Sequence, residues 1–274
     1  MHKAAVRGAA LIAGILTLID CRLPDPPPRY DHVVVVVEEN HDAQQVMGSP
    51  YFASLADRGV SFASFFGITH PSQPNYIGLF SGDTHGVTDD GHHDLSGPNL
   101  ALALENAGLS FAGYSESLPS AGYRGDTAGP YRRKHNPWAS FTNVPDTVNH
   151  PFTDFPADFS QLPTVSIVVP NQDNDMHDGT IAAADAWLRT NLDAYARWAV
   201  SHNSLFIVTF DECAGGKPVS TTPIATVIVG AHVPPRTVLT ARVTLYSLLR
   251  MLLEMYDLDL LGEAESANRI AIWN

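Results

Sequence analysis

The feature that most constrains the fold is an unbroken run of five valines, Val33–Val37. Such a β-branched run is typical of a strand that is buried on both faces, as in a parallel sheet covered by helices. The run ends in Glu38, Glu39 and Asn40. Open α/β sheets bind their ligands at the carboxyl ends of their strands. The sequence therefore predicts a ligand site directly after this strand.

A second hydrophobic run repeats the pattern. Leu205–Phe210 is followed by Asp211 and Glu212. Parallel strands end at the same edge of a sheet, so two strands that end in oxygen donors indicate a metal site there. Alternate side chains of a strand face opposite ways, so Glu38 and Glu39 are expected on opposite faces of the sheet.

Strand and helix signals alternate from residue 31 to the end of the chain. This alternation predicts an α/β fold, a three-layer sandwich with a mostly parallel central sheet and helices on both faces. We expect one domain over 31–274, with a long loop insertion at about 115–160, where periodicity is weak. The expected strands are 60–66, 109–114, 164–169, 205–210 and 225–229, and the expected helices are 49–59, 74–81, 96–107, 180–200 and 245–256.

The N-terminus has the pattern of an export signal. A basic start precedes an apolar run, residues 9–19, which is shorter than the roughly 20 residues of a membrane span. We therefore expect a signal peptide over 1–20, a proline-rich tether over 21–30, a secreted or cell-envelope protein and no stable membrane span. A lipoprotein through Cys21 stays open, although Asp20 stands where lipoprotein signals carry a small residue.

Composition limits the partners. The chain has 16 basic and 29 acidic residues and a formal net charge of −13, which disfavours a nucleic-acid partner. The chain has two cysteines, so we expect no disulfide framework. Cys213 is either a ligand or, as we prefer, a small residue in a turn. The sequence gives no indication of the oligomeric state.

Ser72 is the first candidate for catalysis. It lies just ahead of a helix signal that starts at Pro74, where backbone N–H groups and the helix dipole stabilise negative charge. A nearby metal would lower the pKa of the hydroxyl and activate it as a nucleophile. The alternative is an ordinary helix N-cap.

Two polar segments supply further candidates. Residues 171–178 follow a buried strand and contain three Asp, two Asn and one His. His177 could donate a proton to a leaving oxygen or bind a metal, whereas a structural Ca²⁺ loop or a capping turn would explain the same residues. Residues 131–138 hold the one basic cluster of the sequence. That cluster is either an anion-binding lid or a patch that balances local charge.

Together these segments resemble the phosphoesterase family that joins bacterial acid phosphatases to phospholipases C within the alkaline phosphatase superfamily. The resemblance is closest to the small secreted acid phosphatases of the mycobacterial type. It is carried by five blocks in order: His32–His41, Thr69–Gly82, Tyr131–Trp138, Pro170–Leu188 and Thr209–Glu212.

The resemblance implies a set of site residues. Glu39, Asn40, Asp211 and Glu212 match the metal ligands of the family, and Ser72 falls at its nucleophile, which also binds the metal. His177 matches a His-Asp pair near the substrate. In the phospholipase branch, a stretch that contains His follows the late acidic pair. Residues 213–217 of this chain contain no His, so we expect no second metal centre on that side.

These residues predict a metal-dependent phosphatase acting on a small phosphate ester or a phosphoinositide. The expected reaction passes through a phosphoserine intermediate on Ser72, with His177 as the general acid. The expected substrate contacts are Asn75, Lys134, His135, Asp175 and Asp178. Oxygen ligands favour Ca²⁺, Mg²⁺ or Mn²⁺, while Zn²⁺ or iron would need His177 as a ligand. The alternatives are a phospholipase C or phosphodiesterase, and a binding module with a structural Ca²⁺ site.

Overall fold

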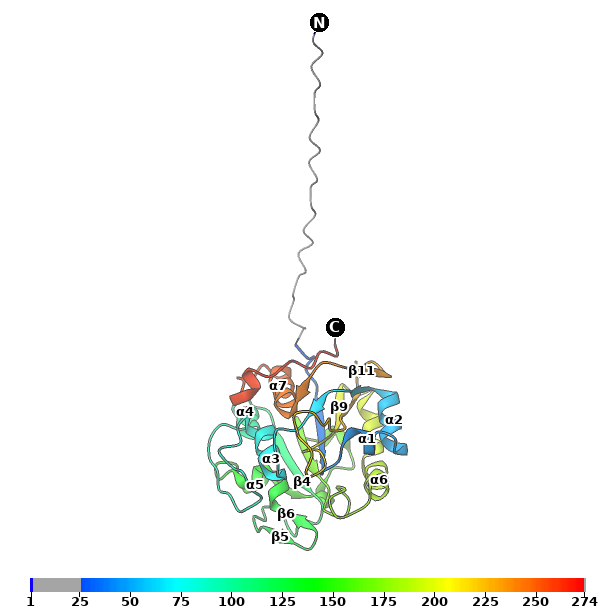
Figure 1. Ribbon diagram of the computed structural model, residues 1–274. Coiled ribbons are helices and arrows are strands. Elements are labelled where there is room, and N and C mark those ends of the chain that lie inside the picture. The colour runs from blue at the N-terminus through cyan, green and yellow to red at the C-terminus, as the bar shows by residue number, and fades with distance from the viewer. Residues whose placement is uncertain (2–25, 274) are drawn as a thin grey trace.

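The valine run is the central strand of an eight-stranded sheet in the computed structural model, which describes residue 1 and residues 26–273 (Figure 1). β1 (His32–Glu38) lies between β8 (Val165–Val169) and β9 (Ser204–Phe210) and is parallel to both. All five valines are at most 1% exposed, which confirms a strand buried on both faces. The predicted signal peptide and Cys21 lie outside the described residues.

The strand order of this sheet is β11-β2-β10-β9-β1-β8-β4-β7. β10 (Val227–Gly230) is antiparallel to both of its neighbours, and the other pairings in this sheet are parallel. The predicted mostly parallel sheet is therefore confirmed. The remaining strands of the sheet are β2 (Val60–Phe62), β4 (Phe111–Ser115), β7 (Asn149–Pro151) and β11 (Thr237–Leu239).

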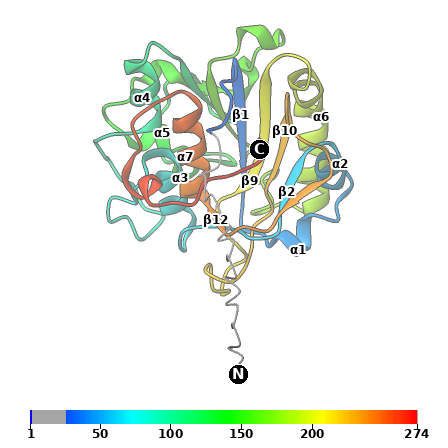
Figure 2. The ribbon, with the colours of Figure 1, turned by 90° about the horizontal axis from the view of Figure 1, so that it is seen from above.

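Helices cover both faces of the sheet, which confirms the three layers. Figure 2 shows α2 (Pro50–Arg58) and α6 (Ile181–Ala199) on one side, and α3, α4, α5 and α7 on the other. Among the described residues, no helix is both long enough and apolar enough to cross a membrane. The other helices are α1 (Ala43–Val46), α3 (Ser72–Ser81), α4 (Leu100–Asn106), α5 (Pro137–Ser140), α7 (Leu245–Met255) and the 3-10 turn η5 (Gly262–Glu265).

Two predicted elements differ from the structure. The helix expected from residue 96 begins at Leu100, because the Asn99 side chain accepts a hydrogen bond from the Leu102 N–H and caps it. The strand expected over 60–66 is split into β2 and β3 (Phe65–Phe66). β3 pairs instead with β12 (Val243–Thr244) in a separate two-stranded sheet.

The segment 115–160, expected as a loop insertion, holds several short elements. Each has only two to four residues, which is too short to produce a periodic sequence pattern. β7 adds to the sheet edge beside β4. The other elements are β5 (Thr127–Ala128), β6 (Tyr131–Arg132), η1 (Arg133–His135), α5, η2 (Asp146–Val148), η3 (Phe152–Asp154) and η4 (Phe159–Gln161).

A tryptophan anchors this segment on the sheet. Trp138 is 1% exposed, and its indole N–H donates to Asn149 Oδ1 at 2.7 Å. The indole lies directly against Gly113 of β4, where any Cβ atom would overlap it. Since Trp138 comes three residues after His135, this contact also fixes the position of η1.

We expect Gly113→Ala to destabilise the protein by about 1–3 kcal/mol, because the added methyl group displaces Trp138 from a closely packed position. The measurement is urea unfolding followed by tryptophan fluorescence. Gly48→Ala is the matched control, since a Cβ at Gly48 meets nothing within 4 Å. An equal loss of stability in both variants would show that the Trp138 contact is unimportant.

Candidate active site

The residues expected at the metal site meet at the carboxyl edge of the sheet. Glu39 follows β1, Asp211 and Glu212 follow β9, and Ser72 is the first residue of α3. Ser72 Oγ donates to Glu39 Oε2 at 3.0 Å and lies 3.3 Å from Glu212 Oε1. The Asn40 backbone N–H donates to Asp211 Oδ1 at 3.1 Å.

The Ser72 side chain does not cap its helix. α3 begins at Ser72, two residues before the predicted start, and its N-cap residue is Pro71. Ser72 is 2% exposed, and its hydroxyl directs its proton to a carboxylate instead of accepting a backbone N–H. The first turn of α3 is satisfied partly by Asp90, whose Oδ1 accepts the Gln73 N–H at 2.9 Å. This geometry favours a nucleophile over the N-cap alternative.

The cluster is crowded with acidic groups. Burial, with the charge of Glu212 beside it, raises the pKa of Asp211 to about 8. Burial also raises the pKa of Glu39 well above its usual range, and the pKa of Asp175 to about 8. Burial lowers the pKa of Lys134, but the hydrogen bond from Lys134 to Asp90 and the charge of Glu39 raise it, and the net effect is a raised pKa. Raised carboxyl pKa values of this kind mark a place where added positive charge would stabilise the ionised forms.

The oxygen donors fit a hard cation. No group of three or more His, Cys, Asp or Glu side chains within residues 26–273 stands ready to hold a metal ion. However, Asn40 Oδ1, Asp211 Oδ2 and Asp175 Oδ2 are buried and have no hydrogen-bond partner. Buried polar atoms without partners are rare, and oxygens of these kinds are what Ca²⁺, Mg²⁺ and Mn²⁺ take as ligands.

Two aromatic rings flank the second oxygen of Glu39. The Tyr76 hydroxyl donates to Glu39 Oε1 at 2.7 Å, and His135 Nε2 lies 3.1 Å from the same oxygen. The two rings are stacked with centroids 5.2 Å apart. Burial, with the charge of Lys134 nearby, lowers the pKa of His135 well below its usual value, so the ring is neutral. His135 thus contacts a predicted ligand.

His177 lies farther from Ser72. Its Nδ1 is 2.7 Å from Asp178 Oδ1, its backbone N–H donates to Asp175 Oδ1 at 2.8 Å, and its ring centroid is 6.3 Å from that of His135. In the part of the chain that the structure describes, no direct contact joins His177 and Ser72. The side chain is 30% exposed, so it can meet a ligand that enters from solvent.

Two expected substrate contacts are engaged elsewhere. The buried Asn75 amide accepts from the N–H groups of Ile68 and Thr69 and donates to the carbonyls of Thr69 and Pro71. These four bonds use its full capacity, so it shapes the turn before Ser72 and a substrate contact is not supported. Lys134 Nζ lies 2.6 Å from Asp90 Oδ2.

Three site residues were missing from the prediction. His70 Nδ1 lies 2.6 Å from Glu212 Oε2, and Asp90 links Gln73 to Lys134. Tyr76 could have been found, because residues four apart share one face of a helix and Ser72 is four residues before it. Nothing in the sequence pattern marks Asp90. Cys213 is buried, with Sγ 3.8 Å from His70 Nε2.

Sequence comparisons show the family. A model of the Phosphoesterase family matches residues 49–258. The chain is 46% identical over 254 residues to a phosphatidylinositol-3-phosphatase of Mycobacterium tuberculosis, covering 90% of this chain and 84% of that protein. It is 33% identical to a phosphate-repressible acid phosphatase of Penicillium chrysogenum over 67% of this chain. The match covers 48% of that protein, so the chain spans about half the length of this relative.

Solved structures support the fold. A protein of the alkaline phosphatase superfamily from Vibrio parahaemolyticus has a TM-score of 0.61 at 13% identity, over 85% of this chain and 68% of that chain. A lipoteichoic acid synthase from Listeria monocytogenes has a TM-score of 0.62 at 9% identity, over 88% of this chain and 76% of that chain. Such identities show the shared architecture alone. The sequence matches establish that the chain belongs to the Phosphoesterase family and is a hydrolase of phosphate esters.

Proposed function

We propose that the protein is a metal-dependent, secreted or cell-envelope phosphatase that hydrolyses phosphate monoesters through a phosphoserine on Ser72. The observation that carries this proposal is the buried Ser72 hydroxyl, which lies between the carboxylates of Glu39 and Glu212. The relative named a phosphatidylinositol-3-phosphatase supports a phosphoinositide or another small phosphate ester as the substrate.

The cation would be held by Glu39, Asn40, Ser72, Asp211 and Glu212. Ca²⁺, Mg²⁺ or Mn²⁺ is favoured over Zn²⁺ or iron. A bound divalent cation would lower the pKa of the Ser72 hydroxyl and offset charge on a phosphoryl oxygen. The unpartnered oxygens of Asn40 and Asp211 support this ligand set. His135 Nε2 lies 3.1 Å from Glu39 Oε1, and Ser72 Oγ donates to the other oxygen, Glu39 Oε2.

The protein groups then divide the chemistry. Ser72 Oγ gives its proton to Glu39 Oε2, its hydrogen-bond partner, and forms a bond to phosphorus while the bond from phosphorus to the ester oxygen breaks. His177, oriented by Asp178, gives its proton to that oxygen. In the second step His177 takes a proton from water, whose oxygen attacks phosphorus, and the bond from phosphorus to Ser72 Oγ breaks as Oγ regains its proton from Glu39. Asp175 Oδ1 accepts the backbone N–H of His177 and so fixes the loop that carries His177. Lys134 offers positive charge to the phosphoryl oxygens.

A phospholipase C or phosphodiesterase is the alternative, because the same nucleophile could attack a diester. It differs in needing room for a second ester group. Comparing p-nitrophenyl phosphate with bis(p-nitrophenyl) phosphate at equal concentration separates the two functions. Faster turnover of the bis-ester would contradict the monoester assignment.

We expect Ser72→Ala to lower kcat for p-nitrophenyl phosphate by roughly 10³-fold or more, because removal of a nucleophile abolishes the covalent route. Acid quenching of the unaltered enzyme with ³²P-labelled substrate should trap a phosphoprotein that Ser72→Ala does not form. Ser81→Ala is the matched control: Ser81 is a buried serine of the same helix, and its hydroxyl donates to the Ile77 carbonyl. Full activity in Ser72→Ala would refute the phosphoserine.

We expect Tyr76→Phe to lower kcat about 10-fold while KM changes little, because Glu39 loses the hydrogen bond that orients it. Tyr30→Phe is the control, since it also removes a buried phenol hydrogen bond, to the Ala231 carbonyl. Both variants should lose similar stability in thermal unfolding. An unchanged kcat in Tyr76→Phe would show that Glu39 is held by other contacts.

We expect chelation to abolish turnover, because the buried carboxylates then lack the charge that balances them. The measurement is p-nitrophenyl phosphate hydrolysis after treatment with EDTA and gel filtration, with Mg²⁺, Ca²⁺, Mn²⁺ and Zn²⁺ restored one at a time. Asp211→Asn should weaken the apparent affinity for the restoring cation. If metal analysis shows that the treated protein is free of metal and its activity is undiminished, metal dependence is overturned.

A further inference from the structure

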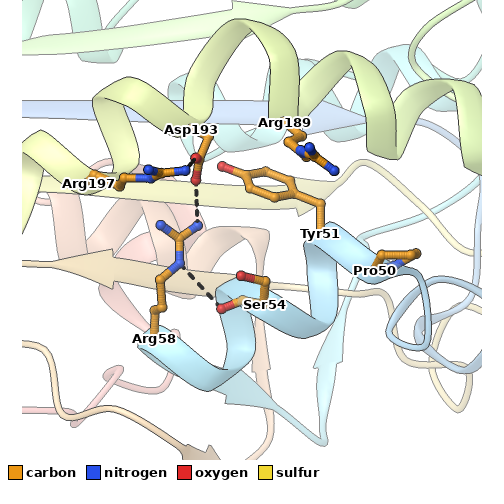
Figure 3. Close-up of a pocket in the computed structure, with 7 residues that line it drawn as sticks. All are labelled: Pro50, Tyr51, Ser54, Arg58, Arg189, Asp193 and Arg197. Atoms are coloured by element: carbon orange, nitrogen blue, oxygen red, sulfur yellow. Dashed lines mark hydrogen bonds and ion pairs between the residues drawn. The ribbon is translucent and has the colours of Figure 1, made fainter.

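A second pocket lies on the face of the sheet away from α3. It has a volume of about 400 Å³ and is lined by side chains of α2 and α6 (Figure 3). Figure 2 shows these two helices on the opposite side of the sheet from α3, which begins at Ser72. The pocket is therefore separate from the candidate active site. Its lining residues are Pro50, Tyr51, Ser54, Arg58, Arg189, Asp193 and Arg197.

The pocket is basic in an acidic protein. Three of the 16 lysine and arginine residues of the chain meet here, although the net charge is −13. Arg189, Asp193 and Arg197 are spaced four residues apart and so share one face of α6. Arg58, the last residue of α2, faces them. Asp193 is the one acidic residue of the lining, which leaves a local net charge of +2.

The arginines differ in how far they are engaged. Arg58 Nη2 lies 3.0 Å from Asp193 Oδ1, and Arg58 Nε donates to the Ser54 carbonyl at 3.3 Å, so this guanidinium is held in place. Arg197 pairs with the other oxygen of Asp193 and is 75% exposed. Among the described residues, the guanidinium of Arg189 has neither a hydrogen bond nor an ion pair. Positive charge therefore remains available to a ligand.

A buried hydroxyl without a partner also lines the pocket. Tyr51 is 4% exposed, and its hydroxyl lies near Asp193 and Arg58 but forms no hydrogen bond of normal geometry. Figure 3 shows Tyr51 and Arg58 reaching from α2 toward the side chains of α6. A buried hydroxyl without a partner costs free energy, which a ligand with an acceptor oxygen would recover.

We propose that this pocket binds a phosphate group. Guanidinium groups donate paired hydrogen bonds to tetrahedral oxyanions, and the Tyr51 hydroxyl adds a neutral donor. A local charge of +2 matches a phosphate dianion. The volume suits a small anion or a single head group and not a helix. Inorganic phosphate and the phosphorylated head group of a lipid share this chemistry.

The test is hydrogen–deuterium exchange of the full chain, with inorganic phosphate as the probe and sodium chloride at equal ionic strength as the reference. Phosphate should slow exchange in residues 50–58 and 185–199. Arg189→Gln combined with Arg197→Gln should raise the phosphate concentration for half protection at least tenfold. The double variant should leave turnover and any protection of residues 69–81 unchanged. Arg236→Gln is the control, because this arginine is 79% exposed and lies outside the pocket.

Vesicles separate the two sources of phosphate. Protection by phosphatidylcholine vesicles that contain a phosphoinositide, but not by free phosphate, would identify a lipid head group as the ligand. Protection by free phosphate identifies a small anion. No protection of the two helices by either probe, or equal protection by sodium chloride, would overturn the proposal. Because residues 69–81 report separately, these outcomes do not depend on the proposed activity of Ser72.

Discussion

The structure depends on keeping several carboxyl groups buried together at the carboxyl edge of the sheet. Glu39 and Asp211 are both fully buried, and each raises the cost of ionising the other. The surrounding groups oppose this cost by donating hydrogen bonds: Ser72 and Tyr76 to Glu39, and the Asn40 N–H to Asp211. Protonation of the carboxyl groups or a bound cation would each relieve this cost, and the proposed cation site corresponds to the second of these.

The sheet supplies the rigidity that this cluster needs. β1 lies between two parallel strands and is covered by helices on both faces, so the backbone that carries Glu39 and Asn40 cannot move independently. The backbone N–H of Asp211 donates to the Glu38 carbonyl at 3.0 Å, and that of Glu39 donates to the Asp175 carbonyl at 2.8 Å. Three loops that are distant in sequence are thereby joined through main-chain bonds before any side chain contributes.

How far the sequence predicts this arrangement depends on the range of the interactions. Strand ends are local features, so Glu39 and Asp211 could be placed at one edge from the valine run and its partner. Contacts across the fold have no local pattern, and therefore Asp90 and the pairing of His70 with Glu212 were missed. Asn75 shows the opposite case. It was expected to contact the substrate, but the backbone turn before Ser72 takes all of its hydrogen bonds.

The adjacent pair Glu38 and Glu39 shows how strand alternation separates structure from chemistry. Both side chains are 0% exposed, yet Glu39 accepts hydrogen bonds from Ser72 and Tyr76 while neither oxygen of Glu38 has a partner. Burial, together with the charge of Asp175, raises the pKa of Glu38 well above its usual value, so this carboxyl is neutral. Burial raises the pKa of Glu39 as well, but only Glu39, on the face toward α3, has hydrogen-bond donors that can support a charged form. Side-chain direction, and not residue type, thus determines which of the two carboxyls can serve a metal and a nucleophile.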